Sequence, residues 1–171
     1  MSSEFKKANI RKNLFKSVPL VLLFVSVLNE IDLNYLGIFS INFPFILIFY
    51  WSLRKSESLG YGYIFFAGVI NDVVSGFPIG ISSFNYLLIC GFAAYLRTIT
   101  LRPNLVKDWF FFLFTILVVN SASYSILNIF FSIDLNYYNL FVNIFFTFIF
   151  YIIFANLFLM YQRKFFKESN D

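Results

Sequence analysis

The chain of 171 residues is 60% hydrophobic and 23% aromatic, and only 13% of its residues are charged. Water-soluble domains rarely show this combination, so the composition indicates an integral membrane protein with no soluble domain of useful size. With no histidine and a single cysteine, the sequence excludes disulfide and zinc frameworks, and it lacks the residues that usually form transition-metal sites.

The first 17 residues are basic and precede an apolar run, as at the start of a signal peptide. No small-x-small cleavage site follows the apolar run, so we expect an uncleaved first transmembrane helix over residues 14–34. The basic residues of this segment are Lys6, Lys7, Arg11, Lys12 and Lys16.

Hydropathy and the charges that interrupt it predict five further segments, at 41–53, 60–76, 79–97, 109–131 and 138–161. The second segment is unusually short. Its length of about 13 residues corresponds to roughly 20 Å of helix, against about 30 Å of hydrocarbon. Either its ends extend into the neighbouring loops, or it lies inside the bundle, where protein and water satisfy its ends.

Positive charges give the orientation of these segments. With six crossings, all 13 basic residues of the chain fall on one side, in the N-terminus, the 54–59 and 97–108 loops and the C-terminal tail. The other side holds Glu30, Asp32 and Asp134. Because cytoplasmic loops are enriched in Lys and Arg, both termini are predicted to be cytoplasmic. The net charge of +4 is therefore a sign of topology and does not indicate nucleic-acid binding.

The predicted fold is an all-α integral membrane protein of about six transmembrane helices, with both termini cytoplasmic and a short second helix. It comprises a basic N-terminal segment at 1–17, a single transmembrane domain at 18–161 and a basic tail at 162–171. The glycines of "GYGYIFFAG" lie in a transmembrane run without a preceding strand, so they do not predict a phosphate-binding loop. No catalytic, metal or cofactor site is expected.

Asp72 is the exception in an apolar segment. Gly68, Asp72 and Gly76 are four residues apart and share one helix face. A lipid-facing carboxylate would cost about 2.5–3.5 kcal/mol, so Asp72 should point into the bundle. Backbone amides at the start of the next helix, after Pro78, are attractive partners because a helix N-terminus favours a negative charge. Contact with another protein or a ligand, and proton or ion translocation, remain alternatives. Side-chain partners are also open: Asn71, Asn85, Ser75, Ser82 and Ser83.

A second polar feature lies in the segment at 109–131. Ser121, Ser125 and Asn128 follow i, i+4, i+7 spacing and make one polar stripe, and Asn120 lies near the middle of the membrane. Hydrogen bonding between helices explains such a stripe, and a substrate path is the alternative.

The stretch "NFPFILIFYWSL", followed by "GYGYIFFAGVINDVVSGFPIGISSFNYLLICGFAAYL", resembles the core of the MreD family of rod shape-determining proteins. The resemblance covers about residues 42–96, and the segments after it match only as hydrophobic helices. The residues that carry it are Pro44, Tyr50, Trp51, Gly68, Asp72, Ser75, Gly76 and Gly80.

This resemblance implies a non-enzymatic component of the bacterial inner membrane that binds MreC. It implies a wider complex with MreB, RodA and a penicillin-binding transpeptidase, which directs lateral cell-wall synthesis and rod shape. The family is also thought to share its fold with the substrate-binding subunits of energy-coupling-factor vitamin transporters, which gives the alternative function. Short outer loops that are poor in ligand-binding groups disfavour that alternative.

In the scaffold hypothesis, a lateral groove bordered by the second, third and fourth segments accepts a partner's transmembrane helix. Gly68, Gly76 and Gly80 would allow the close approach, and Asp72 would hold the 75–80 turn in shape. Packing of each glycine within the monomer is the alternative.

Overall fold

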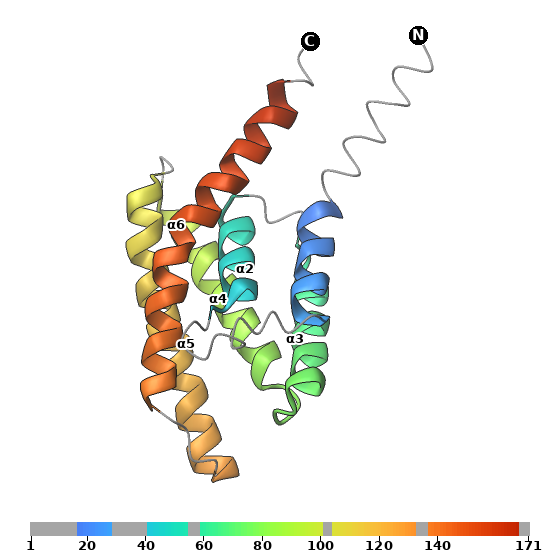
Figure 1. Ribbon diagram of the computed structural model, residues 1–171, viewed down its shortest axis with the longest axis vertical. Coiled ribbons are helices and arrows are strands. Elements are labelled where there is room, and N and C mark those ends of the chain that lie inside the picture. Colours follow the sequence, from blue (N-terminus) through green and yellow to red (C-terminus); the bar gives the residue numbers. More distant parts are fainter. Residues whose placement is uncertain (1–16, 29–40, 55–58, 101–103, 133–136, 168–171) are drawn as a thin grey trace.

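The computed structural model describes residues 17–28, 41–54, 59–100, 104–132 and 137–167, with side chains as far as Arg163. Helices make up nearly all of these ranges, and no strand occurs in them (Figure 1). The helices are Ser17–Leu28, α2 (Phe43–Arg54), α3 (Tyr61–Ser75), α4 (Ile81–Ile99), α5 (Leu105–Phe131) and α6 (Tyr137–Lys167).

The helices fall where hydropathy predicted them, and the differences are at their ends. α5 begins at Leu105 rather than 109, because the Asn104 side chain caps it by accepting a 3.0 Å hydrogen bond from the Val106 amide. α6 continues past the predicted end at 161 to Lys167. The prediction stopped where charged residues end the apolar run, but such residues need not end a helix. Of the first predicted segment, 14–34, only the helix Ser17–Leu28 lies within the described residues.

The short α2 lies inside the bundle, which is the second of the two arrangements expected for it. Every residue from Phe45 to Leu53 is buried. α4 and α6 both pack against α2 (Figure 1). A helix that is apolar on all sides is suited to such a central position, because it has no polar face to present to water.

Hydrogen bonds attach α2 to its neighbours along its length. At its start, the Asn42 amide donates to Thr147 Oγ1 of α6 at 2.9 Å, and Asn42 Oδ1 accepts from the Phe45 amide at 3.2 Å, as an N-cap does. Near its end, Ser52 Oγ donates to Cys90 Sγ of α4 at 3.3 Å. Cys90 is buried there, as expected for a packing residue.

An ion pair joins the end of α2 to the start of α5. Arg54 Nη2 lies 2.6 Å from Asp108 Oδ2, and the two side chains are 16% and 2% exposed. Asp108 occupies the first turn of α5, where the helix dipole favours a negative charge. Sequence analysis did not identify this pair.

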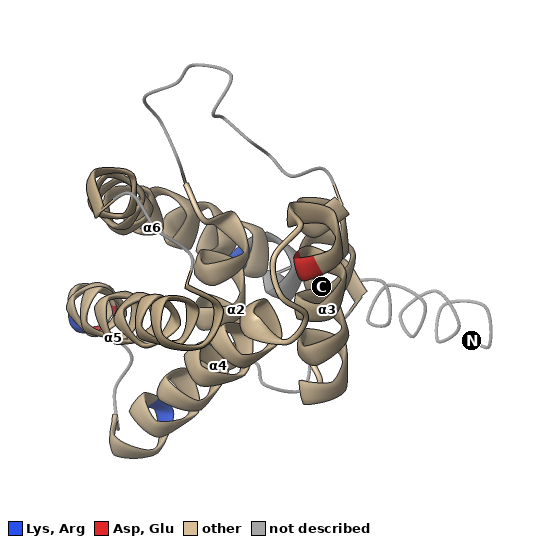
Figure 2. Cartoon of the chain, turned by 90° about the horizontal axis from the view of Figure 1, so that it is seen from below, with Lys and Arg blue, Asp and Glu red and all other residues tan. Residues whose placement is uncertain are grey.

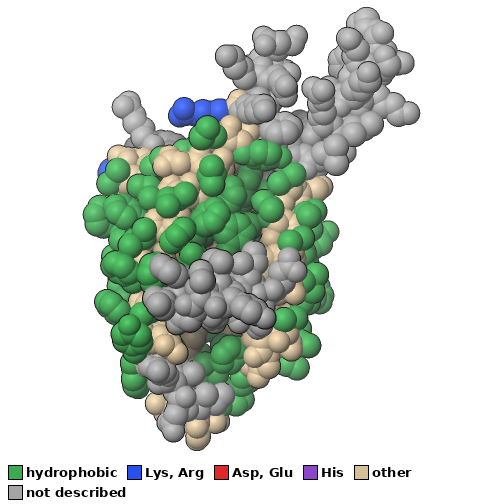
Figure 3. All heavy atoms as spheres, viewed as in Figure 1, with side chains coloured by type: hydrophobic (Ala, Val, Ile, Leu, Met, Phe, Trp, Pro, Cys, Tyr) green, Lys and Arg blue, Asp and Glu red, His purple; other side chains and the backbone are tan. Residues whose placement is uncertain are grey.

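The outer surface of the bundle is largely apolar (Figure 3). Two segments, Leu105–Phe131 and Tyr137–Arg163, are long and apolar enough to cross a membrane. Only 33% and 22% of the residues in their most apolar 18-residue stretches are buried. A core helix of a soluble protein would be mostly buried, so these exposed faces suit a lipid environment. The crossing of all six segments remains a prediction.

Charged side chains are sparse on the described helices (Figure 2). Alternating helix directions bring the described basic residues to the end of the bundle where α5 begins and α6 ends (Figure 1). This matches the predicted partition of positive charge, and the assignment of that end to the cytoplasm stays a prediction. The basic residues concerned are Arg54, Arg97, Lys107 and Arg163.

We expect Asp108→Asn to lower the free energy of unfolding by about 3 kcal/mol, because it leaves the Arg54 guanidinium largely buried without a counter-charge. Thermal and denaturant unfolding of the detergent-purified protein, followed by tryptophan fluorescence, measures the change. A double variant, Arg54→Met with Asp108→Leu, removes both charges and should recover most of the loss. Equal destabilisation by the single and double variants would contradict this account of the pair.

Candidate functional site

Asp72 lies in the last turn of α3, and its side chain is fully buried. Its carboxylate accepts two short hydrogen bonds from the backbone at the start of α4. The Gly80 amide donates to Oδ2 at 2.7 Å, and the Ser82 amide donates to Oδ1 at 2.8 Å. Of the partners considered from the sequence, the backbone amides are the ones that the carboxylate contacts.

These bonds make Asp72 the cap of a helix to which it does not belong. Gly80 holds the N-cap position of α4 and has no side chain with which to cap it. The carboxylate from α3 supplies the missing acceptor and places a negative charge at the positive end of the α4 dipole. The Asp72 carbonyl also accepts from the amides of Gly76 and Phe77, so one residue organises both sides of the turn.

Two glycines in this turn are required by backbone conformation. Gly76 ends α3 with φ 69° and Gly80 precedes α4 with φ 109°, both in the range that disfavours side chains. A Cβ atom built at either position would meet nothing within 4 Å. The turn geometry accounts for both glycines within this chain, and close approach of a partner's helix to Gly76 and Gly80 stays a prediction.

Gly68 does permit a close approach, but to α4 of the same chain. A Cβ atom at Gly68 would lie 2.5 Å from the Ser83 backbone nitrogen and closer still to its Cα. Ser83 Oγ donates to the Phe65 carbonyl at 3.0 Å, which fixes the same contact. Gly68 is therefore used in packing within the chain, and the lateral groove for a partner's helix stays a prediction.

The remaining candidate residues have positions in the packing of α2 and α3. Trp51 is fully buried, with ring centroids 5.7 Å from Tyr50 and 6.0 Å from Phe158. Pro44 lies in the first turn of α2, where a missing amide is tolerated, and Ser75 is the last residue of α3. Pro44 and Ser75 both line a cavity.

The polar stripe of α5 points out of the bundle. Ser121, Ser125 and Asn128 are exposed, and Ser125 Oγ donates to the Ser121 carbonyl of its own helix at 2.9 Å. Among the described residues, no hydrogen bond joins this stripe to another helix of the chain, and bonding to a helix of another protein stays a prediction. Ser123 makes the contact within the chain instead: it is buried, and its hydroxyl donates to Asn85 Oδ1 of α4.

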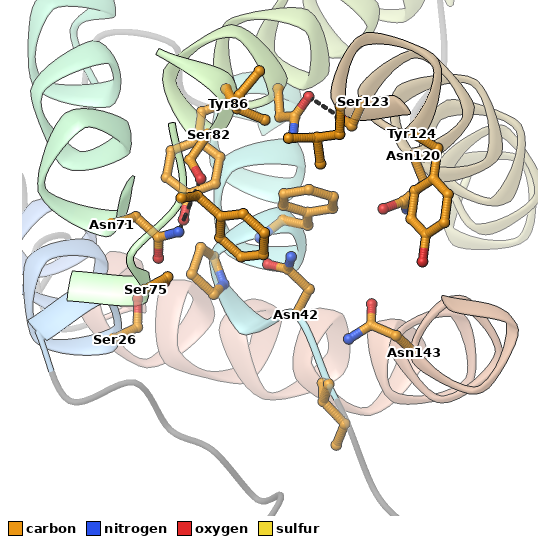
Figure 4. A pocket seen from close by; sticks show the side chains of 17 residues that line it. Ser26, Asn42, Asn71, Ser75, Ser82, Tyr86, Asn120, Ser123, Tyr124 and Asn143 are labelled. Atoms are coloured by element: carbon orange, nitrogen blue, oxygen red, sulfur yellow. Dashed lines mark hydrogen bonds between the residues drawn. The ribbon is translucent and has the colours of Figure 1, made fainter. Parts of the chain in front are cut away.

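The cavity opens between the start of α2, the α3–α4 turn and the facing parts of α5 and α6, and its volume is about 460 Å³. Side chains of Asn42, Asn120, Tyr124 and Asn143 surround the open space (Figure 4). We call it the carboxamide cavity, after the asparagines that line it. They are Asn42, Asn71, Asn85, Asn120 and Asn143.

Within the described part of the chain, no three His, Cys, Asp or Glu side chains lie close enough together to hold a metal ion. The buried polar contacts instead connect helices. They join α3 to α4 through Asp72, α4 to α5 through Ser123, and α2 to α5 through Arg54.

The family model described as rod shape-determining protein MreD matches residues 11–168, which is nearly the whole chain. No curated protein and no solved structure matches the chain.

We expect Gly68→Ala to lower the free energy of unfolding by about 1–3 kcal/mol, because its Cβ atom would overlap the α4 backbone at Ser83. Gly62→Ala in α3 and Gly91→Ala in α4 are matched controls, since a Cβ atom at either meets nothing within 4 Å. Alanine at the controls should leave stability unchanged or raise it by about 0.5–1 kcal/mol. Denaturant titration in detergent measures all three, and equal effects would contradict the close α3–α4 contact.

Proposed function

Because the chain belongs to the MreD family, we propose that it is a non-enzymatic scaffold of the rod-shape complex in the bacterial inner membrane. MreD is a family of shape-determining structural proteins, and membership fits a role in that complex. The two long helices with exposed apolar faces support a place in the membrane. We propose that all six segments cross it, with both termini and the basic 1–17 and 162–171 segments in the cytoplasm.

Its direct partner in this proposal is MreC, and the wider assembly holds MreB, RodA and a penicillin-binding transpeptidase. The bonds that cross between α2, α3, α4 and α5 support a rigid body whose helices are held together by their own contacts. A body of this kind acts through its outer surface. The protein would then hold MreC in position and so help to direct lateral peptidoglycan synthesis.

The observation that carries the choice of surface is the outward polar stripe on α5. Ser121, Ser125 and Asn128 are exposed on a helix that is otherwise apolar enough to span a bilayer. In hydrocarbon, polar side chains find hydrogen-bond partners on their own helix or on another protein helix, and small side chains let a second helix approach closely. Phe114 and Leu117, which are 54% and 45% exposed, extend the same face along α5. We assign the transmembrane helix of MreC to this face.

This assignment predicts that Ser121→Leu with Ser125→Leu and Asn128→Leu reduces the recovery of MreC at least tenfold. The test is affinity purification of the tagged protein from cells in mild detergent, with every co-purifying membrane protein identified. The matched control is Asn156→Leu, which replaces an exposed asparagine on α6 and should leave recovery unchanged.

Normal recovery of MreC with a folded triple variant would place the contact on another face. Recovery of an ATPase with its transmembrane coupling subunit, instead of MreC, would contradict the scaffold proposal. It would favour the substrate-binding subunit of an energy-coupling-factor vitamin transporter.

A further inference from the structure

The carboxamide cavity has the size of a small-molecule site. Its volume of about 460 Å³ lies within the range of about 300–1,000 Å³ that is usual for ligand pockets. It lies at the end of the bundle opposite the described basic side chains, beside the turn that Asp72 holds (Figures 1 and 4). Each helix from α2 to α6 contributes side chains to the lining. The packing of the whole bundle therefore fixes the shape of the cavity.

Local hydrogen bonds hold several of the asparagines by one half of the carboxamide. Asn71 Nδ2 donates to Ser82 Oγ at 2.9 Å, and Asn120 Nδ2 donates to the Ile116 carbonyl at 2.8 Å. Asn42 Oδ1 accepts from the Phe45 amide. The opposite halves, Oδ1 of Asn71 and Asn120 and Nδ2 of Asn42, have no hydrogen bond to the described residues. The cavity therefore presents both acceptors and donors in fixed positions.

No charged side chain lines the cavity among the described residues. Asp72 lies nearby, but its two carboxylate oxygens are occupied by the Gly80 and Ser82 amides. A charged ligand would find no counter-charge on these described side chains, and burying it without one is strongly unfavourable. A purely apolar occupant, such as an acyl chain, would leave the carboxamide groups unpaired at a cost of about 1–3 kcal/mol each. The lining thus selects for an uncharged ligand with several hydrogen-bonding groups.

Aromatic side chains complete the lining. Phe45, Phe77, Tyr86 and Tyr124 place flat apolar surfaces beside the carboxamides. Hydroxyl groups both donate and accept, and the C–H faces of a sugar ring are apolar, so a sugar matches both parts of the lining. We propose that the carboxamide cavity binds one uncharged sugar unit, supplied either as a free sugar or as the head group of a glycolipid.

The test uses the full chain in nanodiscs of phosphatidylcholine and phosphatidylglycerol, purified in a polyoxyethylene detergent. Maltoside and glucoside detergents are avoided because they carry a sugar head group. The probes are radiolabelled glucose, measured by equilibrium dialysis, and monoglucosyl diacylglycerol, measured by native mass spectrometry with diacylglycerol as the reference. We expect saturable binding of one sugar per chain. If glucose binds and competes with the glycolipid, the cavity accepts a free sugar. If only the glycolipid binds, the ligand is a glycolipid head group.

Asn120→Leu with Asn143→Leu should weaken this binding at least tenfold, and Asn156→Leu, outside the cavity, should leave it unchanged. Ser75→Leu fills the cavity from the end of α3 and should abolish binding. It serves as the second variant if the double variant fails to fold. Absence of sugar binding to the wild type, or equal binding by folded cavity variants, would overturn the proposal and leave a water-filled cavity. This outcome is independent of MreC recovery, so the two proposals can fail separately.

Discussion

A buried carboxylate with no cation to pair with must find hydrogen-bond donors, and the fold of the α3–α4 hairpin follows from how Asp72 does so. Its two oxygens accept from the Gly80 and Ser82 amides, and its charge lies at the N-terminus of α4. The glycines at 76 and 80 allow the chain to turn tightly enough for those amides to reach it. The free-energy cost of burying the Asp72 carboxylate is offset by these two hydrogen bonds. The same bonds fix the angle between α3 and α4.

That fixed hairpin positions the rest of the bundle. Gly68 brings α3 against the backbone of α4, and the short α2 packs against α4 as well. The C-terminal end of α2 is held by the ion pair between Arg54 and Asp108, at the start of α5. The carboxamide cavity lies where these elements converge, and the outward face of α5 is the surface proposed for a partner. Helices joined by their own buried contacts and an apolar exterior with a polar stripe are features that suit the proposed membrane scaffold.

Hydropathy predicted the five helices from α2 to α6 with differences of up to six residues at their ends. Pro78 and the rule that helix N-termini attract anions favoured backbone amides among several candidate partners of Asp72. What the sequence could not show depends on tertiary direction. The spacing of polar residues in α5 correctly predicted that Ser121 and Ser125 share one helix face. Only the packing shows that this face points outward and that Ser123 points inward. Arg54 and Asp108 are 54 positions apart, and no local pattern connects them. Glycines at 68 and 76 looked alike, although one is needed for contact and the other for its positive φ.

The most direct test of the central role of Asp72 is hydrogen–deuterium exchange of the peptide that covers residues 77–84, in lipid nanodiscs, for wild type and Asp72→Ala. The account predicts slow exchange of the Gly80 and Ser82 amides in the wild type. It predicts much faster exchange of both in Asp72→Ala, while α5 and α6 stay protected. Rapid exchange of these amides in the wild type, or unchanged protection in the variant, would contradict the account of Asp72 as the cap of α4.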